Sequence, residues 1–474
     1  MSNSWQTFTC TPTFNAMSNT TSTGRWRIPN IALTLTCAFL TAVTGANAQT
    51  PAPHAATLDS AISLGEAARL AATQGAGAAA ARFRTEAFAA RARESRSALL
   101  PNVGVELSDG QRTFNTASFG LPLPGFDPKG EVIGPVRTVD IRGRVVANII
   151  DPAALSRYRT AQAATSGANA EATVVAEQAA AAAANAYIRV LRAEAQLAAR
   201  AADSSLAAEL IDIASAQLDA GVGVALDVTR ARSQMAAVRA QLITARNERD
   251  RAKVELLRTM GLPFTQTIVL SDSLGAAMLP DAMLDAATLT SEAIRSRPDL
   301  VAAEAAVATA RRSVSSARAE RLPTLGVFAD DGATSNGYAN LLHTYTYGVQ
   351  VSVPVFQGFR SSARIEEQTA TLHQSEMRQR DLAQQVEAEV RTAILDVASA
   401  RERVTAARER MRLAEEELSQ SRDRFRAGVA GNADVISAQL NLDAARSEEV
   451  EALTSLQVSQ LAIARATGRL TALP

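Results

Sequence analysis

Cysteine and tryptophan are nearly absent from this 474-residue chain. The two cysteines, Cys10 and Cys37, and the two tryptophans, Trp5 and Trp26, all lie before residue 48. If that amino-terminal stretch is removed, the remaining chain has no disulfide, no thiol nucleophile and no cysteine-based metal site. An exported chain of this kind would make no use of an oxidising compartment for covalent cross-links.

Histidine is also scarce, and the usual signatures of catalysis are missing. The three histidines, His54, His343 and His373, are far apart in the sequence, so neither a catalytic nor a metal site is expected. The GVG at 221–223 is not followed by the lysine and hydroxyl residue of a phosphate-binding loop. We therefore expect no enzyme, no metal and no cofactor.

Net charge and long apolar runs are absent as well. The chain has 48 basic and 48 acidic residues, and its histidines are neutral at pH 7. A near-neutral chain has no electrostatic footprint for nucleic acid. Beyond residue 48, no uncharged apolar stretch reaches the ~18 residues of a membrane-spanning helix, so none is expected.

Residues 1–48 have the layout of a secretory signal peptide. Arg25 and Arg27 precede a short apolar stretch, and Ala46-Asn47-Ala48 provide an A-x-A cleavage end. The apolar stretch is too short to span a membrane. We therefore predict export, with cleavage after Ala48.

An internal repeat organises the rest of the chain. A shift of 207 residues aligns two stretches without a gap, and such self-similarity indicates two copies of one structural unit. We expect a first repeat at 49–261, a linker at 262–287 and a second repeat at 288–474. The aligned pairs are Gly221/Gly428, Asp227/Asp434, Val228/Val435, Ala231/Ala438, Arg239/Arg446, Arg258/Arg465 and Gly261/Gly468.

Each copy shows the same order of elements: a helix, two strands, a very long helix and a final helix. The expected first helices are 58–98 and 288–321. The expected strands are 102–114 and 138–150 in the first copy, then 324–330 and 345–356 in the second. The expected helical hairpins are 152–259 and 359–467.

The strand segments alternate apolar and polar residues. In the last one, Tyr345, Tyr347, Val349, Val351 and Val353 share one face, while polar residues share the other. This pattern predicts either a small water-soluble sheet or a barrel wall with lipid outside and water inside. We favour the barrel because no other segment offers a large core to cover such a sheet.

The long helices carry a heptad pattern with large residues at one position and alanine three residues later. In the second copy the pattern runs through Val390, Val397 and Val404, while Arg200 and Ser204 interrupt it in the first copy. Period seven predicts left-handed supercoiling. Some 67 residues of helix would extend about 100 Å, which suits a tube that crosses a large gap.

The two glycine turns end the long helices in the same way. Gly221 and Gly428 stand where a helix commonly stops with a left-handed residue. Asp227 and Asp434 are then predicted to be either helix caps or residues on the rim of a tube.

Four strands per chain cannot close a barrel, so several chains must share one, which predicts a cyclic oligomer with an axial channel.

The chain resembles a TolC-like outer-membrane efflux protein. The resemblance rests on SRPDLVAAEA at 296–305, on ALLPNVGV and RLPTLGV before the strands, and on both glycine tips. It implies a mainly α protein with membrane β: a homotrimer whose 12-stranded β-barrel continues into a periplasmic α-helical barrel. It also implies the outer membrane as location and outer-membrane lipid as surroundings.

The implied function is the exit duct of a tripartite efflux or type I secretion system. Its partners would be a periplasmic adaptor, that is, a membrane fusion protein, and an inner-membrane pump. The alternative is a periplasmic coiled-coil adaptor or scaffold. At the tip, Gly221, Asp227, Arg230, Gly428, Asp434 and Ser437 are the candidate gate and adaptor-contact residues.

The tips depart from the family in one respect. Some relatives carry a second acid one turn after the tip aspartate, where this chain has Arg230 and Ser437. A trimer would then have a single ring of carboxylates from Asp434. Arg230 would pair with an acid across the tip.

Overall fold

The computed structural model describes residues 61–119, 125, 127, 129–275 and 285–473. The predicted signal peptide, 1–48, lies outside the described residues. Among the helices of the described part, none combines the length and apolar character needed to cross a membrane.

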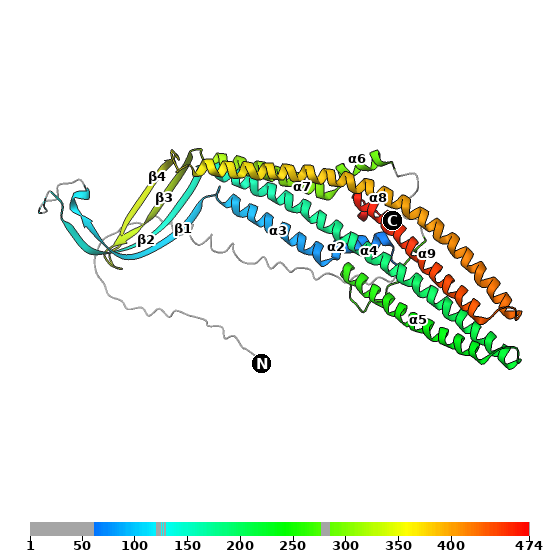
Figure 1. Cartoon of the computed structure of the whole chain (residues 1–474). Coiled ribbons are helices and arrows are strands. Elements are labelled where there is room, and N and C mark those ends of the chain that lie inside the picture. The colour runs from blue at the N-terminus through cyan, green and yellow to red at the C-terminus, as the bar shows by residue number, and fades with distance from the viewer. Residues whose placement is uncertain (1–60, 120–124, 126, 128, 276–284, 474) are drawn as a thin grey trace, which may run out of the picture. The chain divides into compact units, whose positions relative to one another are not determined.

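Four strands form one antiparallel sheet in the order β1-β2-β3-β4 (Figure 1). They are β1 (Asn102–Asn115), β2 (Val132–Ile150), β3 (Thr324–Ser335) and β4 (Leu342–Ser352). The central pairing of β2 with β3 joins the two repeats, and β1 and β4 are the edges.

The strand ends differ from those expected. β2 begins before the expected residue 138, and β3 extends past 330 because its polar end, through Ser335, is still paired with β2. The expectation that the last strand runs to 356 is wrong, since β4 ends at Ser352. Pro354 follows two residues later, and proline has no N–H to donate to a neighbouring strand.

One face of this sheet is apolar and is left uncovered by the rest of the described chain. The register places Leu107 opposite Ile141 and Val327 opposite Val349, so their side chains share a face. The other face is polar, and there Arg142 pairs with Asp140 and Asp330, at 2.6 Å each. The exposed apolar residues on the first face are Val103, Val105, Leu107, Ile141, Val145, Tyr345, Tyr347, Val349 and Val351.

Each expected first helix is divided in two. In the first copy, α2 (Leu64–Gln74) and α3 (Ala76–Ser97) meet at Gly75, where an added Cβ would lie 2.4 Å from the Ala71 carbonyl oxygen. In the second copy, α6 (Ala286–Ser296) ends before Pro298, the first residue of α7 (Pro298–Ala319). Proline disfavours helical backbone in the residue before it, which explains the break.

The long helices form two hairpins, α4 (Pro152–Asp219) with α5 (Ala225–Met260) and α8 (Arg360–Arg426) with α9 (Asn432–Ala466) (Figure 1). With 68 and 67 residues, α4 and α8 each extend about 100 Å. Near the sheet, the neighbours in space follow the order α3, α4, α7, α8.

The heptad positions of α8 are mostly buried as expected, whereas in α4 the heptad residue Leu218 is 37 % exposed. The buried positions in α8 include Val390, Val397, Val404, Ala393, Ala400 and Ala407. Part of the expected linker 262–287 also packs into the core, through Leu262, Ile268 and Leu274.

A buried tyrosine holds the linker against the first long helix. The Tyr187 hydroxyl, on α4, lies 2.8 Å from both the Asp272 carboxylate and the Ile62 carbonyl. Burial, and then the Asp272 carboxylate, raise the pKa of Tyr187 above its usual value. The linker therefore contributes to packing as well as connecting the repeats.

Candidate functional site

The two hairpin tips, residues 220–227 and 427–434, have the same backbone geometry. Gly221 has φ +74° and its amide donates to the Leu218 carbonyl, while the Val222 amide donates to Gln217. Gly428, at φ +70°, repeats both bonds with Phe425 and Arg424 as acceptors. This pair of bonds defines a Schellman motif, in which glycine adopts the left-handed conformation without steric cost.

The tip aspartates are not the N-caps of the following helices. The N-cap residues are Val224 and Gly431, and neither makes a side-chain capping hydrogen bond. Asp227 and Asp434 are the third residues of α5 and α9, so the capping interpretation is wrong for both. A carboxylate in the first turn still interacts favourably with the helix dipole.

The two aspartates differ in exposure and in pairing. The Asp227 side chain is 18 % exposed, and its carboxylate lies 3.8 Å from the Arg230 guanidinium. Arg230 belongs to the same helix, so the expected pairing across the tip is replaced by a contact one turn away. Asp434 is exposed and, within the described chain, forms no ion pair. Ser437, one turn further along α9, is also exposed and brings no charge.

Asn432 joins the two tips, which sequence reasoning did not foresee. Its side chain is fully buried, and its Nδ2 donates to the Asp227 carbonyl at 2.9 Å. The 207-residue shift aligns Asn432 with Ala225, so this difference between the two copies was the sequence feature that could have identified Asn432. The Asn432 bond ties the start of α9 to the start of α5.

Both turns expose valine. The Val222 side chain is 80 % exposed and Val429 is 72 % exposed, with Val224 and Leu226 exposed beside the first turn. Each tip therefore presents an exposed valine at the end of its hairpin.

A buried charge network joins α4 to α9 midway along the hairpins. The Asp203 carboxylate, only 2 % exposed, pairs with Arg446 and lies 3.3 Å from the Arg200 guanidinium. Arg200 also pairs with Asp443 and donates to the Ser447 hydroxyl at 2.9 Å. Arg200 is one of the two residues that interrupt the heptad pattern. The sequence therefore indicated that this position is unusual, but it did not identify the partners of Arg200.

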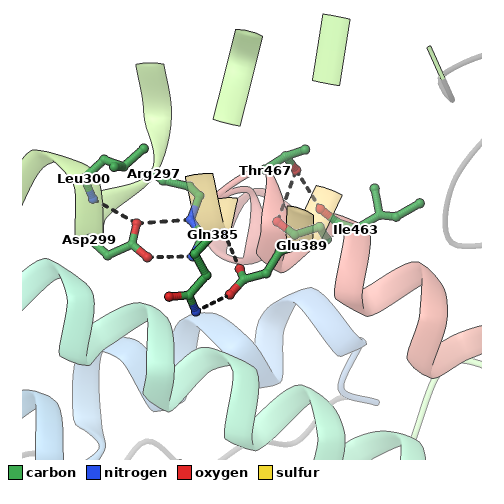
Figure 2. Close-up of polar contacts among 8 residues, drawn as sticks. Arg297, Asp299, Leu300, Gln385, Glu389, Ile463 and Thr467 are labelled. Carbon is green, nitrogen blue, oxygen red and sulfur yellow. Dashed lines mark hydrogen bonds and ion pairs between the residues drawn. The ribbon is translucent and has the colours of Figure 1, made fainter. Parts of the chain in front are cut away.

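The SRPDL segment at 296–300 takes part in a second charge network, which Figure 2 shows. The Arg297 side chain is 8 % exposed, and its guanidinium contacts Asp299 at 2.6 Å and Glu389 at 2.5 Å. Gln385 donates to the other Glu389 oxygen at 2.8 Å. The Ser296 hydroxyl donates to the Thr467 carbonyl at 2.9 Å. The junction of α6 and α7 is thus fastened to α8 and to the end of α9.

The pKa values of this network reflect the pairing. Burial opposes the charged form of Glu389, but the hydrogen bonds from Arg297 and Gln385 outweigh it, so the pKa of Glu389 lies below its usual value. For Arg297, burial again opposes the charge, and the bonds to Asp299 and Glu389 raise its pKa above the usual value. Both groups therefore stay charged near neutral pH.

A protein-family model described as "Outer membrane efflux protein" matches residues 78–262 and 289–469, one segment in each repeat. Among curated relatives, the outer membrane efflux protein BepC of Brucella suis is 28 % identical over 264 residues, or 54 % of this chain and 56 % of that protein. The alkaline protease secretion protein AprF of Pseudomonas aeruginosa is 26 % identical over 238 residues, 49 % of each chain. The chain thus spans about half the length of the curated relatives it matches.

Solved structures share the fold. The outer-membrane channel OprN has a TM-score of 0.71 at 19 % identity, covering 85 % of this chain and 89 % of that chain. The outer membrane protein VceC of Vibrio cholerae has a TM-score of 0.70 at 17 % identity, covering 85 % and 96 %. The duplicated helix–strand–strand–long helix–helix fold is therefore that of outer-membrane channels.

Proposed function

Because the chain belongs to the outer membrane efflux protein family, and so lies in the outer membrane with a large periplasmic portion, we propose that it is a passive exit duct. It would conduct substrates from a periplasmic adaptor and an inner-membrane pump to the exterior, in a tripartite efflux or type I secretion system. The names of its relatives range from protease secretion to pyoverdine export and cation efflux. The proposal is therefore limited to the duct and names no cargo.

The observation that carries the proposal is the open four-stranded sheet. Its strands β1 and β4 are edges without a strand partner in the described chain, and one of its faces is apolar and exposed. In lipid, every backbone N–H and C=O must be paired, so an open sheet is not viable in a bilayer. Three chains would supply twelve strands and close a barrel, with the apolar face toward lipid and the polar face toward water.

The hairpin tips would then form the periplasmic end of the duct. A homotrimer has six tips, each with an exposed valine and a Schellman turn. We assign adaptor contact to the turns at Gly221 and Gly428, and the constriction to Asp434, the exposed and unpaired tip acid. The recessed Asp227, with Arg230 beside it, would lie behind the constriction.

The experiment is to purify the full chain from outer-membrane fractions and measure its oligomeric state and its conductance in planar bilayers. We expect a heat-modifiable trimer that forms discrete channels. A monomer that fractionates with soluble periplasmic proteins and forms no channels would contradict the proposal. That result would favour the periplasmic adaptor or scaffold instead.

A further inference from the structure

A cavity of about 380 Å³ lies between α3, α4, α7 and α8, near the ends of these helices that adjoin the sheet. Its arginines are Arg91, Arg157 and Arg364, each within two helical turns of such an end. The volume is in the range of small-molecule sites. The cavity is far along the chain from the tips and shares no residue with the sites described above.

The lining is positively charged and mostly uncompensated. Glu320 is the acid of the lining, and it pairs with Arg364 at 3.4 Å. Within the part of the chain that the structure describes, Arg91 and Arg157 form no ion pair. Two exposed guanidinium groups without a carboxylate partner in the described chain therefore border one pocket that is open to solvent.

The remaining lining suits an anion with several oxygen atoms. The Arg91 guanidinium lies 5.3 Å from the centre of the Phe88 ring, which restricts its position beside the cavity. The hydroxyl groups of Ser95 and Ser316 also line the cavity, whereas those of Thr160 and Ser313 already donate to the Ser156 and Thr309 carbonyls. Ser316 is buried.

Arginine is also the cation best matched to phosphate. Its planar guanidinium donates two parallel N–H bonds to neighbouring oxygens, which a lysine ammonium cannot do. The chain uses arginine almost exclusively, since Lys129 and Lys253 are its only lysines.

We propose that this cavity binds an oxyanion of the phosphate class through Arg91 and Arg157. Arg364 would hold Glu320 at the edge of the site. Two sources carry this chemistry, a free phosphate compound and the headgroup of an anionic phospholipid. The lipid source rests on the proposed membrane insertion of the sheet, because it places the cavity near the headgroups of the periplasmic leaflet. Basic pockets between helices at such a boundary are known to suit anionic headgroups.

The test uses the full chain in a nonionic detergent and phosphate-free buffer. Pyrophosphate binding is measured by calorimetry. In parallel, native mass spectrometry measures retention of phosphatidylglycerol and cardiolipin, against phosphatidylcholine, after release from nanodiscs. The variants are Arg91→Gln and Arg157→Gln. Their matched controls are Arg93→Gln and Arg159→Gln, exposed arginines on the same helices that lie outside the cavity lining.

We expect each cavity variant to weaken anion binding about tenfold, the loss typical of one charged hydrogen bond, while the controls bind like the wild type. Glu320→Gln should strengthen binding, because it removes the competing carboxylate. Binding of pyrophosphate alone would assign a soluble source, and retention of anionic lipid alone would assign the lipid source. Neither result depends on channel formation, so the proposal can fail while the duct stands. Equal binding by wild type and both cavity variants, or no binding of either probe, would overturn it.

Discussion

The two hairpin tips have one backbone geometry and two charge arrangements. The same pair of hydrogen bonds closes the turns at Gly221 and Gly428, 207 residues apart. Yet Asp227 is recessed beside Arg230, whereas Asp434 is exposed and followed by Ser437. Duplication has therefore kept the chain path while the exposure and the charge partners of the side chains diverged.

The middle of the hairpins shows the same divergence. Asp203 of α4 aligns with Arg410 of α8 under the 207-residue shift. Asp203 is buried in the network that joins α4 to α9, whereas Arg410 is exposed and pairs with Glu448 on the neighbouring helix of its own hairpin. The aligned position thus joins the two hairpins in the first copy, as Asp203, and lies exposed on the surface in the second, as Arg410.

The largest expected effect concerns the network around Arg297, at the break between α6 and α7. The matching break in the first copy, between α2 and α3, has Gln74 and Gly75 and no such arginine. Arg297→Met removes the cation and leaves Glu389 partly buried without its partner. Breaking a buried pair in this way costs about 3 kcal/mol. Urea unfolding followed by helical circular dichroism would measure this cost.

The control for Arg297 is Arg295→Met, because within the described residues the exposed Arg295 makes only a hydrogen bond inside α6. The pH dependence gives a second readout. The folded-state pKa of Glu389 is lowered, so its contribution to stability is present above its unfolded pKa and is lost as pH falls through the folded value. We expect Arg297→Met to lose less stability on acidification than the wild type. If wild type and Arg297→Met lose equal stability on acidification, the Glu389 pairing does not contribute to the pH dependence.

The next effect in size is at the contact between hairpins. Asp203→Asn removes the carboxylate that Arg446 contacts and leaves Arg200 paired with Asp443 alone. We expect a loss of about 2 kcal/mol and faster amide exchange in the middle of α4 and α9. Asp212→Asn, an exposed aspartate on the same helix, is the control. If Arg410→Gln destabilises the chain as much as Asp203→Asn, the contrast between the copies fails.

The sequence predicted the repeat, the strand faces and the glycine turns because each depends on local rules. A period of two, a heptad and a left-handed glycine can be read without knowing the neighbours. The networks of Arg297 and Asp203 could not be predicted from local patterns, because Arg297 contacts a residue 92 positions away and Asp203 one 243 positions away. The heptad interruption at Arg200 marked one of them. The capping interpretation of Asp227 and Asp434 failed because the N-cap falls three residues earlier, and cap positions depend on where the turn ends.

The tip acids allow a direct comparison in the channel. Asp434→Ala should raise conductance and weaken block by divalent cations about tenfold, because a trimer loses three carboxylates from the constriction. Asp227→Ala should change both quantities less, since Arg230 already offsets its charge. Planar-bilayer recordings with added Mg²⁺ would measure both variants. If Asp227→Ala has the larger effect, the constriction belongs to the first tip.

The smallest effect tests the backbone that the tips share. Alanine at Gly221 or Gly428 must adopt φ near +70°, which costs about 1 kcal/mol at either tip. Gly167→Ala is the matched control, because Gly167 lies inside α4, the helix that Gly221 ends, and an added Cβ there meets its nearest atom at 3.8 Å. That change should stabilise the chain by up to about 1 kcal/mol, since alanine favours a helix interior. Thermal unfolding of the three variants would therefore shift in opposite directions. Equal losses at Gly221 and Gly428 would mean that the two copies differ in charge and not in the strain of their turns.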